Sequence, residues 1–337
     1  MRQVCITKRG GPEVLEVREA PDPTAGPGQI RIRVKAAGLN FAEVMARIGL
    51  YPDAPKPPCV LGYEVAGEVD QVGDGASFKV GDRVIALTRF GGHSDVVVVP
   101  SVQAAKIPET LGWEKAAALP VQYLTAWIML IHLGNIRPGE KVLVHSAAGG
   151  VGQAALQICR WKGAEVFGTA SASKHARLKE LGVAHCIDYT SVDFEPEVMR
   201  LTNGKGVDIV LDAVGGKSFA RSYRVLAPLG RLFCFGGSAF APGQGLNPLA
   251  LMKAFFGMPK FKPFDMMTSN KGVFGVNLGH LWEKGAEIQM MLSAILEKVA
   301  DGTFDPVIDS VFPFSEAGKA HERMKGRQAF GKILLVP

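Results

Sequence analysis

The chain has 337 residues, of which 47% are hydrophobic and 21% charged, and its formal net charge is +6 at pH 7. These values predict a soluble, folded protein of two domains, each able to bury its own core. The lysines and arginines are scattered, which favours a phosphorylated small molecule over nucleic acid as the anionic ligand. Five cysteines without a C-x-x-C pair argue against a disulfide framework. With no signal peptide and no apolar stretch of bilayer length, we expect a cytoplasmic protein.

The first 121 residues contain short β-type runs separated by proline and glycine, which predict a compact β-barrel. The expected strands are Ile30–Lys35, Glu64–Val72 and His93–Val99, and one helix is expected at Phe41–Ile48. Asn40 precedes this helix, and Glu43 lies three residues further on, which is the spacing of a capping box.

From Leu119 onward, helical and β-type segments alternate, which is typical of a doubly wound parallel sheet. The expected helices are Val121–Leu133, Val151–Trp161, Lys174–Leu181 and Ser218–Val225. The expected strands are Val142–His145, Val166–Gly168, Cys186–Asp188, Val207–Leu211 and Arg231–Phe235.

Residues 237–272 interrupt this alternation with a stretch rich in Gly, Pro, Met and Phe that predicts a long loop. Lysines break up its apolar residues, so we favour a lid or a subunit contact over contact with a membrane. Beyond it we expect a helix at 270–281 and then the elements Glu287–Ala300 (helix), Val307–Pro313 (strand), Phe314–Met324 (helix) and Gly331–Val336 (strand).

The stretch KVLVHSAAGGVG, residues 141–152, joins an expected strand to an expected helix through a glycine turn. Such a turn lets backbone approach a ligand closely, and the start of the helix attracts a pyrophosphate. We therefore predict that Ala148, Gly149, Gly150 and Val151 bind a dinucleotide. The alternative is a tight turn whose glycines serve packing only, since a glycine cluster alone is a weak signal.

The residues after the second strand of this unit predict which dinucleotide is bound. NAD-specific domains carry an acidic residue about 20 positions past the glycines, where it binds the ribose hydroxyls. Residues 166–174 contain no carboxylate here, and their hydroxyls and lysine suit a 2′-phosphate. We therefore predict NADPH rather than NADH, with Thr169, Ser171 and Lys174 as ligands. The alternative for Lys174 is a solvated residue in the first turn of a helix.

Several stretches together resemble one family, the medium-chain dehydrogenase/reductases, and within it the zinc-independent quinone oxidoreductase (zeta-crystallin-like) branch. The matching motifs are AAGLNFAE (36–43), GLYP (49–52), LGYEVAGEV (61–69), VGDRV (80–84), RPGEKVLVHSAAGGVG (137–152) and GKILL (331–335). The insert and NKGVFGVNL (270–278) are similar to the vesicle amine transport protein-like members of that branch.

The resemblance implies an α/β fold of two domains. A GroES-like β-barrel catalytic domain would comprise residues 1–121, completed by 279–337, and a Rossmann dinucleotide-binding domain would comprise residues 122–278. The family also implies a homodimer formed through the edge of the Rossmann sheet.

Zinc separates the branches of this family. Zinc-dependent relatives carry a cysteine near position 40, a G-H-E motif and often a lobe with four cysteines. This chain has Asn40 and Gly62-Tyr63-Glu64, and it lacks the lobe, so we expect no metal. Glu64 and His93 remain as potential ligands, but packing or surface roles are favoured for both.

The resemblance also implies individual site residues. The catalytic group comprises Asn40, Tyr51, Tyr63 and Thr125, although capping explains Asn40 almost as well, and the two tyrosines could simply pack. Further cofactor contacts are implied for Tyr189, Phe235, Phe274, Val276 and Lys332. Tyr189 could equally be a packing residue, and Lys332 an ordinary lysine of an edge strand.

Without a zinc ion to stabilise an oxyanion, quinones and α,β-unsaturated carbonyls are the easier acceptors of a hydride, because conjugation spreads the charge. The sequence therefore predicts an NADPH-dependent quinone or enone reductase. No residue has the signature of a general acid, so we expect water to supply the proton. Two alternatives stay open: an enoyl-thioester reductase, and a dinucleotide-binding membrane or interaction protein with vestigial activity.

Overall fold

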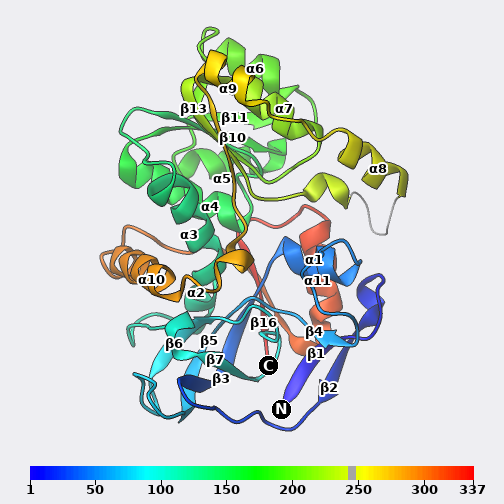
Figure 1. Cartoon of the computed structure of the whole chain (residues 1–337), viewed down its shortest axis with the longest axis vertical. Coiled ribbons are helices and arrows are strands. Elements are labelled where there is room, and N and C mark those ends of the chain that lie inside the picture. Colours follow the sequence, from blue (N-terminus) through cyan, green and yellow to red (C-terminus); the bar gives the residue numbers. More distant parts are fainter. Residues whose placement is uncertain (242–247) are drawn as a thin grey trace. The chain divides into compact units, whose positions relative to one another are not determined.

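The computed structural model describes residues 1–241 and 248–337, which form two compact units (Figure 1). Of these residues, 1–124 and 278–337 belong to the first unit, and 125–241 and 248–277 to the second. The chain passes from one unit to the other inside helix α3 (Pro120–Trp127), between Leu124 and Thr125. None of the helices in the described ranges is long and apolar enough to cross a bilayer.

The first unit is built on a seven-stranded sheet in the order β15-β16-β3-β5-β6-β8, with β7 also paired to β3. Its strands are β3 (Gln29–Leu39), β5 (Glu64–Val72), β6 (Arg83–Leu87), β7 (Val96–Pro100), β8 (Ala104–Lys106), β15 (Ile308–Pro313) and β16 (Lys332–Val336). Alternate residues of β3, namely Ile30, Ile32 and Val34, are buried in the core, as the two-residue period of a strand requires. This arrangement confirms the predicted β-rich domain.

A smaller sheet and the remaining helices complete this unit. The sheet has the order β2-β1-β4, with β1 (Arg2–Ile6), β2 (Leu15–Glu19) and β4 (Cys59–Val60). The helices are α1 (Phe41–Arg47), α2 (Trp113–Ala117), α10 (Gly285–Ala300) and α11 (Ala317–Lys325). The sequence patterns did not predict β1 and β2.

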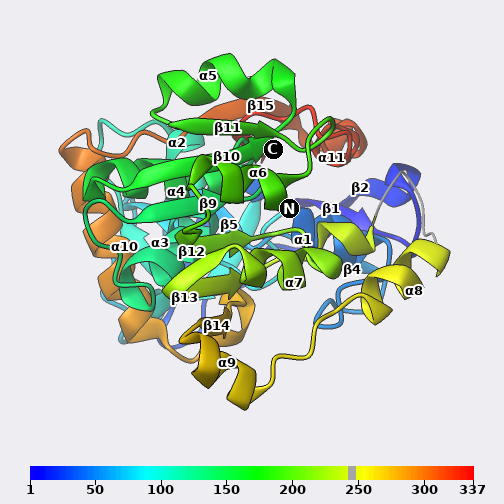
Figure 2. The ribbon, with the colours of Figure 1, turned by 90° about the horizontal axis from the view of Figure 1, so that it is seen from above.

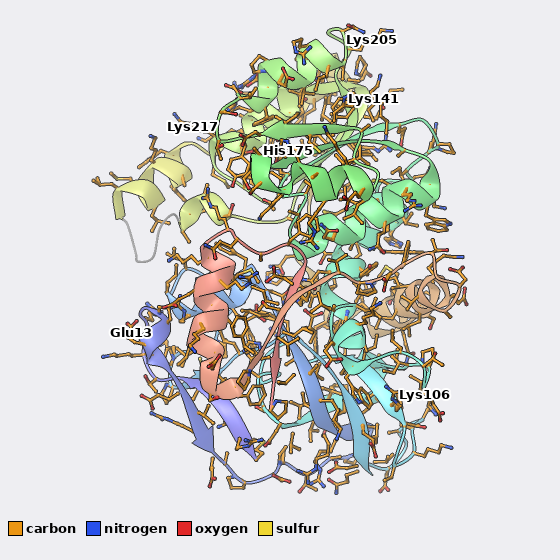
Figure 3. The ribbon with its side chains drawn as sticks, turned by 180° about the vertical axis from the view of Figure 1, so that it is seen from behind. Glu13, Lys106, Lys141, His175, Lys205 and Lys217 are labelled. Carbon is orange, nitrogen blue, oxygen red and sulfur yellow. The ribbon has the colours of Figure 1, made fainter. Side chains whose placement is uncertain are left out.

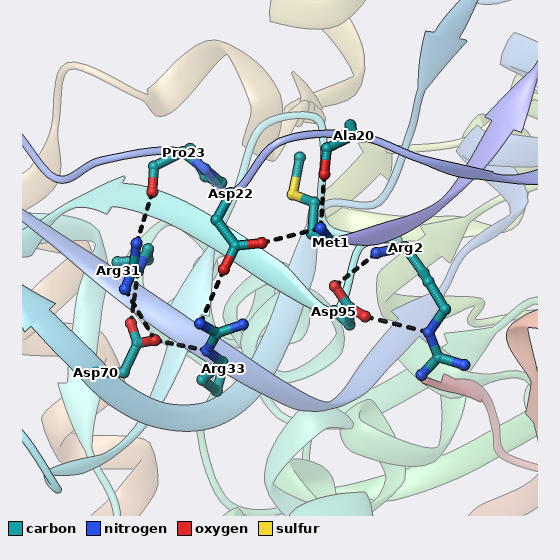
Figure 4. Close-up of polar contacts among 9 residues, drawn as sticks. All are labelled: Met1, Arg2, Ala20, Asp22, Pro23, Arg31, Arg33, Asp70 and Asp95. Carbon is teal, nitrogen blue, oxygen red and sulfur yellow. Dashed lines mark hydrogen bonds and ion pairs between the residues drawn. The ribbon is translucent and has the colours of Figure 1, made fainter.

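Charged side chains tie the N-terminal segment of this unit to its large sheet (Figure 4). Asp70 of β5 accepts from Arg31 at 2.8 Å and from Arg33 at 2.6 Å, both on β3. Asp22 pairs with Arg33 at 2.8 Å and with the amino group of Met1 at 2.9 Å. Each such pair near the surface contributes little stability alone, but together they hold the N-terminal segment against the large sheet.

The second unit contains a six-stranded parallel sheet in the order β11-β10-β9-β12-β13-β14. Its strands are β9 (Lys141–Val144), β10 (Glu165–Ala170), β11 (His185–Asp188), β12 (Val207–Asp212), β13 (Leu226–Cys234) and β14 (Gly272–Gly275). Its helices are α4 (Gly150–Lys162), α5 (His175–Glu180), α6 (Phe194–Leu201) and α7 (Lys217–Arg224). Figure 2 shows α4 on one side of the sheet and α6 and α7 on the other. The predicted doubly wound parallel sheet is thus confirmed.

Two expectations for the region after β13 are wrong. The described part of the insert is not a loop, because it contains α8 (Pro248–Phe256) and α9 (Pro263–Ser269); residues 242–247 lie outside the described ranges. The helix expected at 270–281 is replaced by β14, which pairs with β13, and by a 3-10 turn at Leu278–Leu281. Pairing with a neighbouring strand decides the conformation of this short apolar segment.

Candidate functional site

The glycine turn of the second unit follows β9 and ends at Gly149, the N-cap residue of α4. Ser146 adopts a left-handed conformation (φ 55°), and its carbonyl accepts from the Gly149 amide at 2.8 Å. The amides of residues 150–152 come before the first hydrogen bond within the helix, which Gln153 donates to the Gly149 carbonyl at 2.8 Å. A helix start of this kind is suited to an anionic group such as a pyrophosphate.

Packing alone explains one of the glycines. A Cβ atom on Gly152 would lie 2.5 Å from the Ser146 carbonyl oxygen and 2.6 Å from that of Ala147. On Gly149 the nearest atom would be the Ser146 carbonyl oxygen at 3.3 Å. Gly152 is therefore needed to close the turn, whereas contact of Ala148, Gly149, Gly150 and Val151 with a dinucleotide stays a prediction.

The three residues predicted to bind a 2′-phosphate lie at and beyond the carboxyl end of β10, beside the glycine turn because β10 pairs with β9. Thr169 is buried, and its hydroxyl accepts from the Ser146 amide at 3.3 Å. Ser171 is the N-cap of the 3-10 turn Ala172–Lys174, Lys174 is its last residue, and both are half-buried. Tyr189 follows the neighbouring strand β11 and is exposed.

The other cofactor contacts implied for this unit also gather near the carboxyl ends of its strands. Phe235 follows β13, and its amide donates to the Asp212 carbonyl at 3.2 Å. Val276 follows β14, and its amide donates to the Cys234 carbonyl at 3.0 Å. The ring of Phe274 stacks on Phe233 with 5.1 Å between centroids. This is the edge of a parallel sheet at which dinucleotides bind in this class of fold.

In the first unit, the Asn40 side chain is the centre of a buried polar cluster. Its Oδ1 accepts from Gln122 Nε2 at 2.7 Å and from Lys332 Nζ at 2.8 Å. Its Nδ2 donates to Glu64 Oε1 at 3.1 Å and to Glu43 Oε1 at 3.2 Å. These four bonds are the most that an amide side chain can make. The expected capping box is also present, with Glu43 Oε2 accepting from the Asn40 backbone amide at 2.8 Å.

Lys332 and Glu64 form an ion pair in this cluster, with side chains 2% and 0% exposed. Glu64 Oε2 also accepts from the Val121 amide at 2.7 Å. A Cβ atom on Gly38 would lie 2.3 Å from Glu64 Oε1, so only glycine lets the carboxylate reach this position. Lys332 is not on an edge strand, because β16 lies between β15 and β3. That alternative is wrong, and contact of Lys332 with the cofactor stays a prediction.

Glu43 and His93 are buried beside the cluster. Burial raises the pKa of Glu43 to about 8 and lowers the pKa of His93 to about 4. His93 is therefore neutral at pH 7, and its Nε2–H donates to the Gly38 carbonyl at 3.1 Å. Within the part of the chain that the structure describes, no three His, Cys, Asp or Glu side chains are grouped to hold a metal ion.

The two tyrosines expected in the catalytic group lie close together in the same unit. The rings of Tyr51 and Tyr63 meet edge to face with centroids 6.1 Å apart, and Tyr63 also packs against Phe90 at 5.5 Å. Burial raises the pKa of Tyr63, so its phenol stays protonated at neutral pH. Thr125 is buried on α3, the helix that also carries Gln122, but it belongs to the second unit.

The sequence patterns missed several residues of these clusters. Gln122 lies three residues before Thr125, and this helical spacing could have pointed to it. Glu43 was expected only as a capping residue. In the second unit, His145 and Asp212 lie at the carboxyl ends of β9 and β12 and belong to a buried network under the glycine turn.

Comparison with known proteins agrees with this architecture. The alcohol dehydrogenase GroES-like domain model matches residues 26–109, and the zinc-binding dehydrogenase model matches residues 181–335. The human synaptic vesicle membrane protein VAT-1 homolog is 42% identical over 100% of this chain and 86% of its own length.

Solved structures also resemble the whole chain, and two of them serve as examples. One is Escherichia coli quinone oxidoreductase complexed with NADPH, with 30% identity, 100% coverage of both chains and a TM-score of 0.88. The other is the human synaptic vesicle membrane protein VAT-1 homolog-like protein, with 33% identity, coverage of 100% of this chain and 98% of that chain, and a TM-score of 0.87. The chain therefore belongs to the medium-chain dehydrogenase/reductase superfamily, in its zinc-independent, quinone oxidoreductase-like branch near the VAT-1 homologues.

Proposed function

We propose that the protein is an NADPH-dependent reductase that delivers a hydride to quinones or α,β-unsaturated carbonyls without zinc. The observation that carries the proposal is the ligand set beside the glycine turn, where residues 166–174 offer hydroxyls and Lys174 but no carboxylate. The glycine turn would hold the pyrophosphate, and Lys174 with Ser171 would hold the 2′-phosphate. The third predicted ligand, Thr169, would instead act from behind the turn, because its buried hydroxyl lies against the Ser146 amide and His145. The E. coli quinone oxidoreductase, which has the same fold, is complexed with NADPH.

The donor set in the first unit does not fit zinc. Position 40 carries an amide whose hydrogen bonds are all used within the fold, and position 63 carries a buried, protonated phenol. Thiolate and imidazole ligands are therefore missing where zinc-dependent relatives have them. Bound NADPH supplies a hydride from C4 of its nicotinamide, and a conjugated acceptor spreads the resulting negative charge over several atoms. Uncharged donors such as Tyr51 then suffice to orient the carbonyl.

The test is oxidation of NADPH, followed by the near-ultraviolet absorbance of reduced nicotinamide, with a panel of quinones, enones and one enoyl thioester. NADH is run in parallel, and each reaction is repeated with a chelator. We expect turnover that prefers NADPH and is insensitive to the chelator. Turnover only with the enoyl thioester would select the thioester reductase instead. Tight NADPH binding without turnover of any acceptor would contradict the reductase.

A second candidate function is attachment to an anionic membrane surface. Five apolar residues of α8 and α9, which we call the α8–α9 face, are 68% to 80% exposed: Leu249, Phe255, Phe256, Phe264 and Met267. Exposed lysines flank them at positions 253, 260 and 262, against one acidic residue, Asp265. Aromatic residues beside lysines are typical of surfaces that bind anionic lipid headgroups.

The packing of α8 explains why this face points outward. Ala254 is buried, and a Cβ atom on Gly216 would lie 3.3 Å from its carbonyl oxygen, so this side of α8 packs on the turn before α7. Lys217, which starts α7, marks this place in Figure 3. The curated relative named above is called a synaptic vesicle membrane protein, which supports a membrane role for this branch.

Flotation with lipid vesicles tests this second function. We expect binding to vesicles rich in phosphatidylserine, weak binding to neutral vesicles, and loss of binding in the variant F255S/F256S/F264S. The matched control is L229S, which removes an apolar residue equally exposed elsewhere in the second unit. Equal binding by both variants would contradict the proposal. If the wild type does not float with vesicles, the α8–α9 face could instead join two copies of the protein. Sedimentation of the triple variant decides this, because a homodimer formed through this face should be lost. If the homodimer persists, we propose that it forms at an edge of the parallel sheet.

A further inference from the structure

A continuous chain of hydrogen bonds runs beneath the glycine turn of the second unit. The Ser146 amide donates to Thr169 Oγ1 at 3.3 Å, and Thr169 Oγ1 lies 3.2 Å from His145 Nδ1. On the other side of the imidazole, Nε2 lies 3.0 Å from Ser222 Oγ, which donates to Asp212 Oδ2 at 2.7 Å. The four side chains in the chain are buried, and they come from the ends of β9, β10 and β12 and from α7.

The donor and acceptor of each hydrogen bond in this series follow from the carboxylate at its end, Asp212. Asp212 is surrounded by donors, because its Oδ1 accepts from the amides of Val214 at 2.7 Å and Gly215 at 3.2 Å, and its Oδ2 accepts from Ser218 at 2.7 Å as well as from Ser222. Ser222 therefore uses its proton on Asp212, and its oxygen must accept from His145 Nε2–H.

These bonds fix the tautomer of the His145 imidazole. Burial lowers the pKa of His145, so the ring is neutral at pH 7 and carries one proton, on Nε2. Its Nδ1 accepts from the Thr169 hydroxyl, whose oxygen in turn accepts from the Ser146 amide. Every bond from Ser146 to Asp212 thus points the same way. The imidazole also packs against the Phe194 ring in a T-shaped contact, with 4.6 Å between the two ring centroids.

Ser146 is the residue around which the glycine turn is built. Its left-handed backbone is unfavourable for a residue with a side chain, so neighbouring bonds must hold it. Thr169 supplies two of these, since its hydroxyl accepts from the Ser146 amide and its carbonyl accepts from the Ala147 amide at 3.1 Å. The Ser146 carbonyl in turn receives the Gly149 amide. The position of Thr169 therefore sets the position of the turn.

We propose that His145 is a positioning residue that links Asp212 to the glycine turn. Asp212 also holds the turn at Val214 and Gly215. The link through His145 sets the affinity for the dinucleotide. The inference rests on the proposed function, because the ligand is the NADPH assigned there. It adds that Ser222, which lies on α7 and has no assigned contact with the cofactor, controls how tightly the cofactor is held. Hydrogen bonds behind a binding group commonly control affinity in this way.

NADPH binding by the variants S222A, T169V and S222A/T169V tests the link. We expect each single variant to bind NADPH about three- to tenfold more weakly, which is the range for a lost buried hydrogen bond. The double variant should bind NADPH no more weakly than the single variant of lower affinity, because both changes interrupt the same series of hydrogen bonds. T202V is the matched control: Thr202 is equally buried in the same unit, and its hydroxyl bonds to the Val198 carbonyl and the Gly206 amide outside the chain. It should lower the melting temperature without weakening NADPH binding.

The tautomer of His145 gives a second readout that needs no cofactor. Imidazole 15N shifts, assigned by comparison with the H145Q variant among the seven histidines, should show the proton on Nε2. A proton on Nδ1 would overturn the proposal, as would S222A binding NADPH like the wild type. If the wild type itself does not bind NADPH, the proposed function fails. The tautomer of His145 then decides alone whether the hydrogen bonds from Ser146 to Asp212 run in the direction described.

Discussion

The Lys332 ammonium of β16 is bonded to the Glu64 carboxylate of β5, although 268 residues separate them along the sequence. Both side chains are buried, and Lys332 also donates to Asn40, the residue at the start of α1. A buried carboxylate and a buried ammonium are each costly alone, so the pair is stable only while both members are present. The position of Asn40 therefore depends on the last strand of the chain.

This dependence predicts the effect of removing one partner. K332M should lower the free energy of unfolding by about 3 to 5 kcal/mol, because it leaves the Glu64 charge unpaired in the core. The double variant K332M/E64Q should recover part of the loss, since the glutamine side chain that it introduces is uncharged and can still accept from the Val121 amide. Urea unfolding of the two variants measures this difference. A double variant no more stable than K332M would contradict it.

The pKa of Glu43 predicts how stability changes with pH. Burial raises this pKa from 4.5 to about 8, so above 4.5 the unfolded state loses the proton that the folded state keeps, and stability falls until about pH 8. Below 6.5, His93 opposes this effect because burial lowers its pKa to about 4. The effect of Glu43 should therefore emerge between 6.5 and about 8, at roughly 1.4 kcal/mol per pH unit at most.

The variant E43Q should remove this slope while it keeps the capping box, which glutamine also completes. Urea unfolding across the pH window measures the slope. E68Q, at an exposed position of β5, is the matched control and should behave like the wild type. An unchanged slope in E43Q would assign the pH dependence to another group.

The glycine turn predicts a large effect of one methyl group. G152A places a Cβ atom 2.5 Å from the Ser146 carbonyl oxygen, so the turn must open. We expect a loss of about 1 to 3 kcal/mol in the free energy of unfolding, and NADPH affinity should fall with it. G112A, at the N-cap of α2, is the control because its nearest neighbour would lie at 3.8 Å. Calorimetry with and without NADPH measures both effects.

The preference for NADPH over NADH should depend on Lys174. If its ammonium binds the 2′-phosphate, K174A should lower kcat/KM for NADPH by about tenfold or more and leave that for NADH unchanged. K179A, at an exposed lysine on α5, is the control. Equal losses with the two cofactors would mean that Lys174 supports the fold rather than the phosphate.

Much of the second unit could be predicted because its signals are local. Each of β9, β10 and β12 is a short apolar run, and α4 shows helical spacing, so the alternation is visible in the sequence. The expected helix at 270–281 is wrong because only two apolar residues, Val273 and Phe274, lie between the glycines of β14. A segment this short has no period of its own, and pairing with β13 decides its conformation.

The candidate site could be predicted only in part, for a similar reason. Asn40 could be found from its motif and its capping position. That Gln122 and Lys332 bond to it could not be predicted, because they come from distant segments that only the folded sheet brings to Asn40. His145 likewise gives no signal, since a lone histidine after an apolar strand usually indicates a core residue.

The position of β16 has a consequence for biosynthesis. As the chain leaves the ribosome, β3 appears early, but β16, which pairs with it, and the counter-ion of Glu64 are made only after the parallel sheet. Until then the first unit holds an open strand edge and an unpaired carboxylate, whereas all strands of the parallel sheet are already made. The second unit should therefore fold first during translation, and a ribosome stalled before Lys332 should display a protease-resistant parallel sheet beside an unfinished barrel.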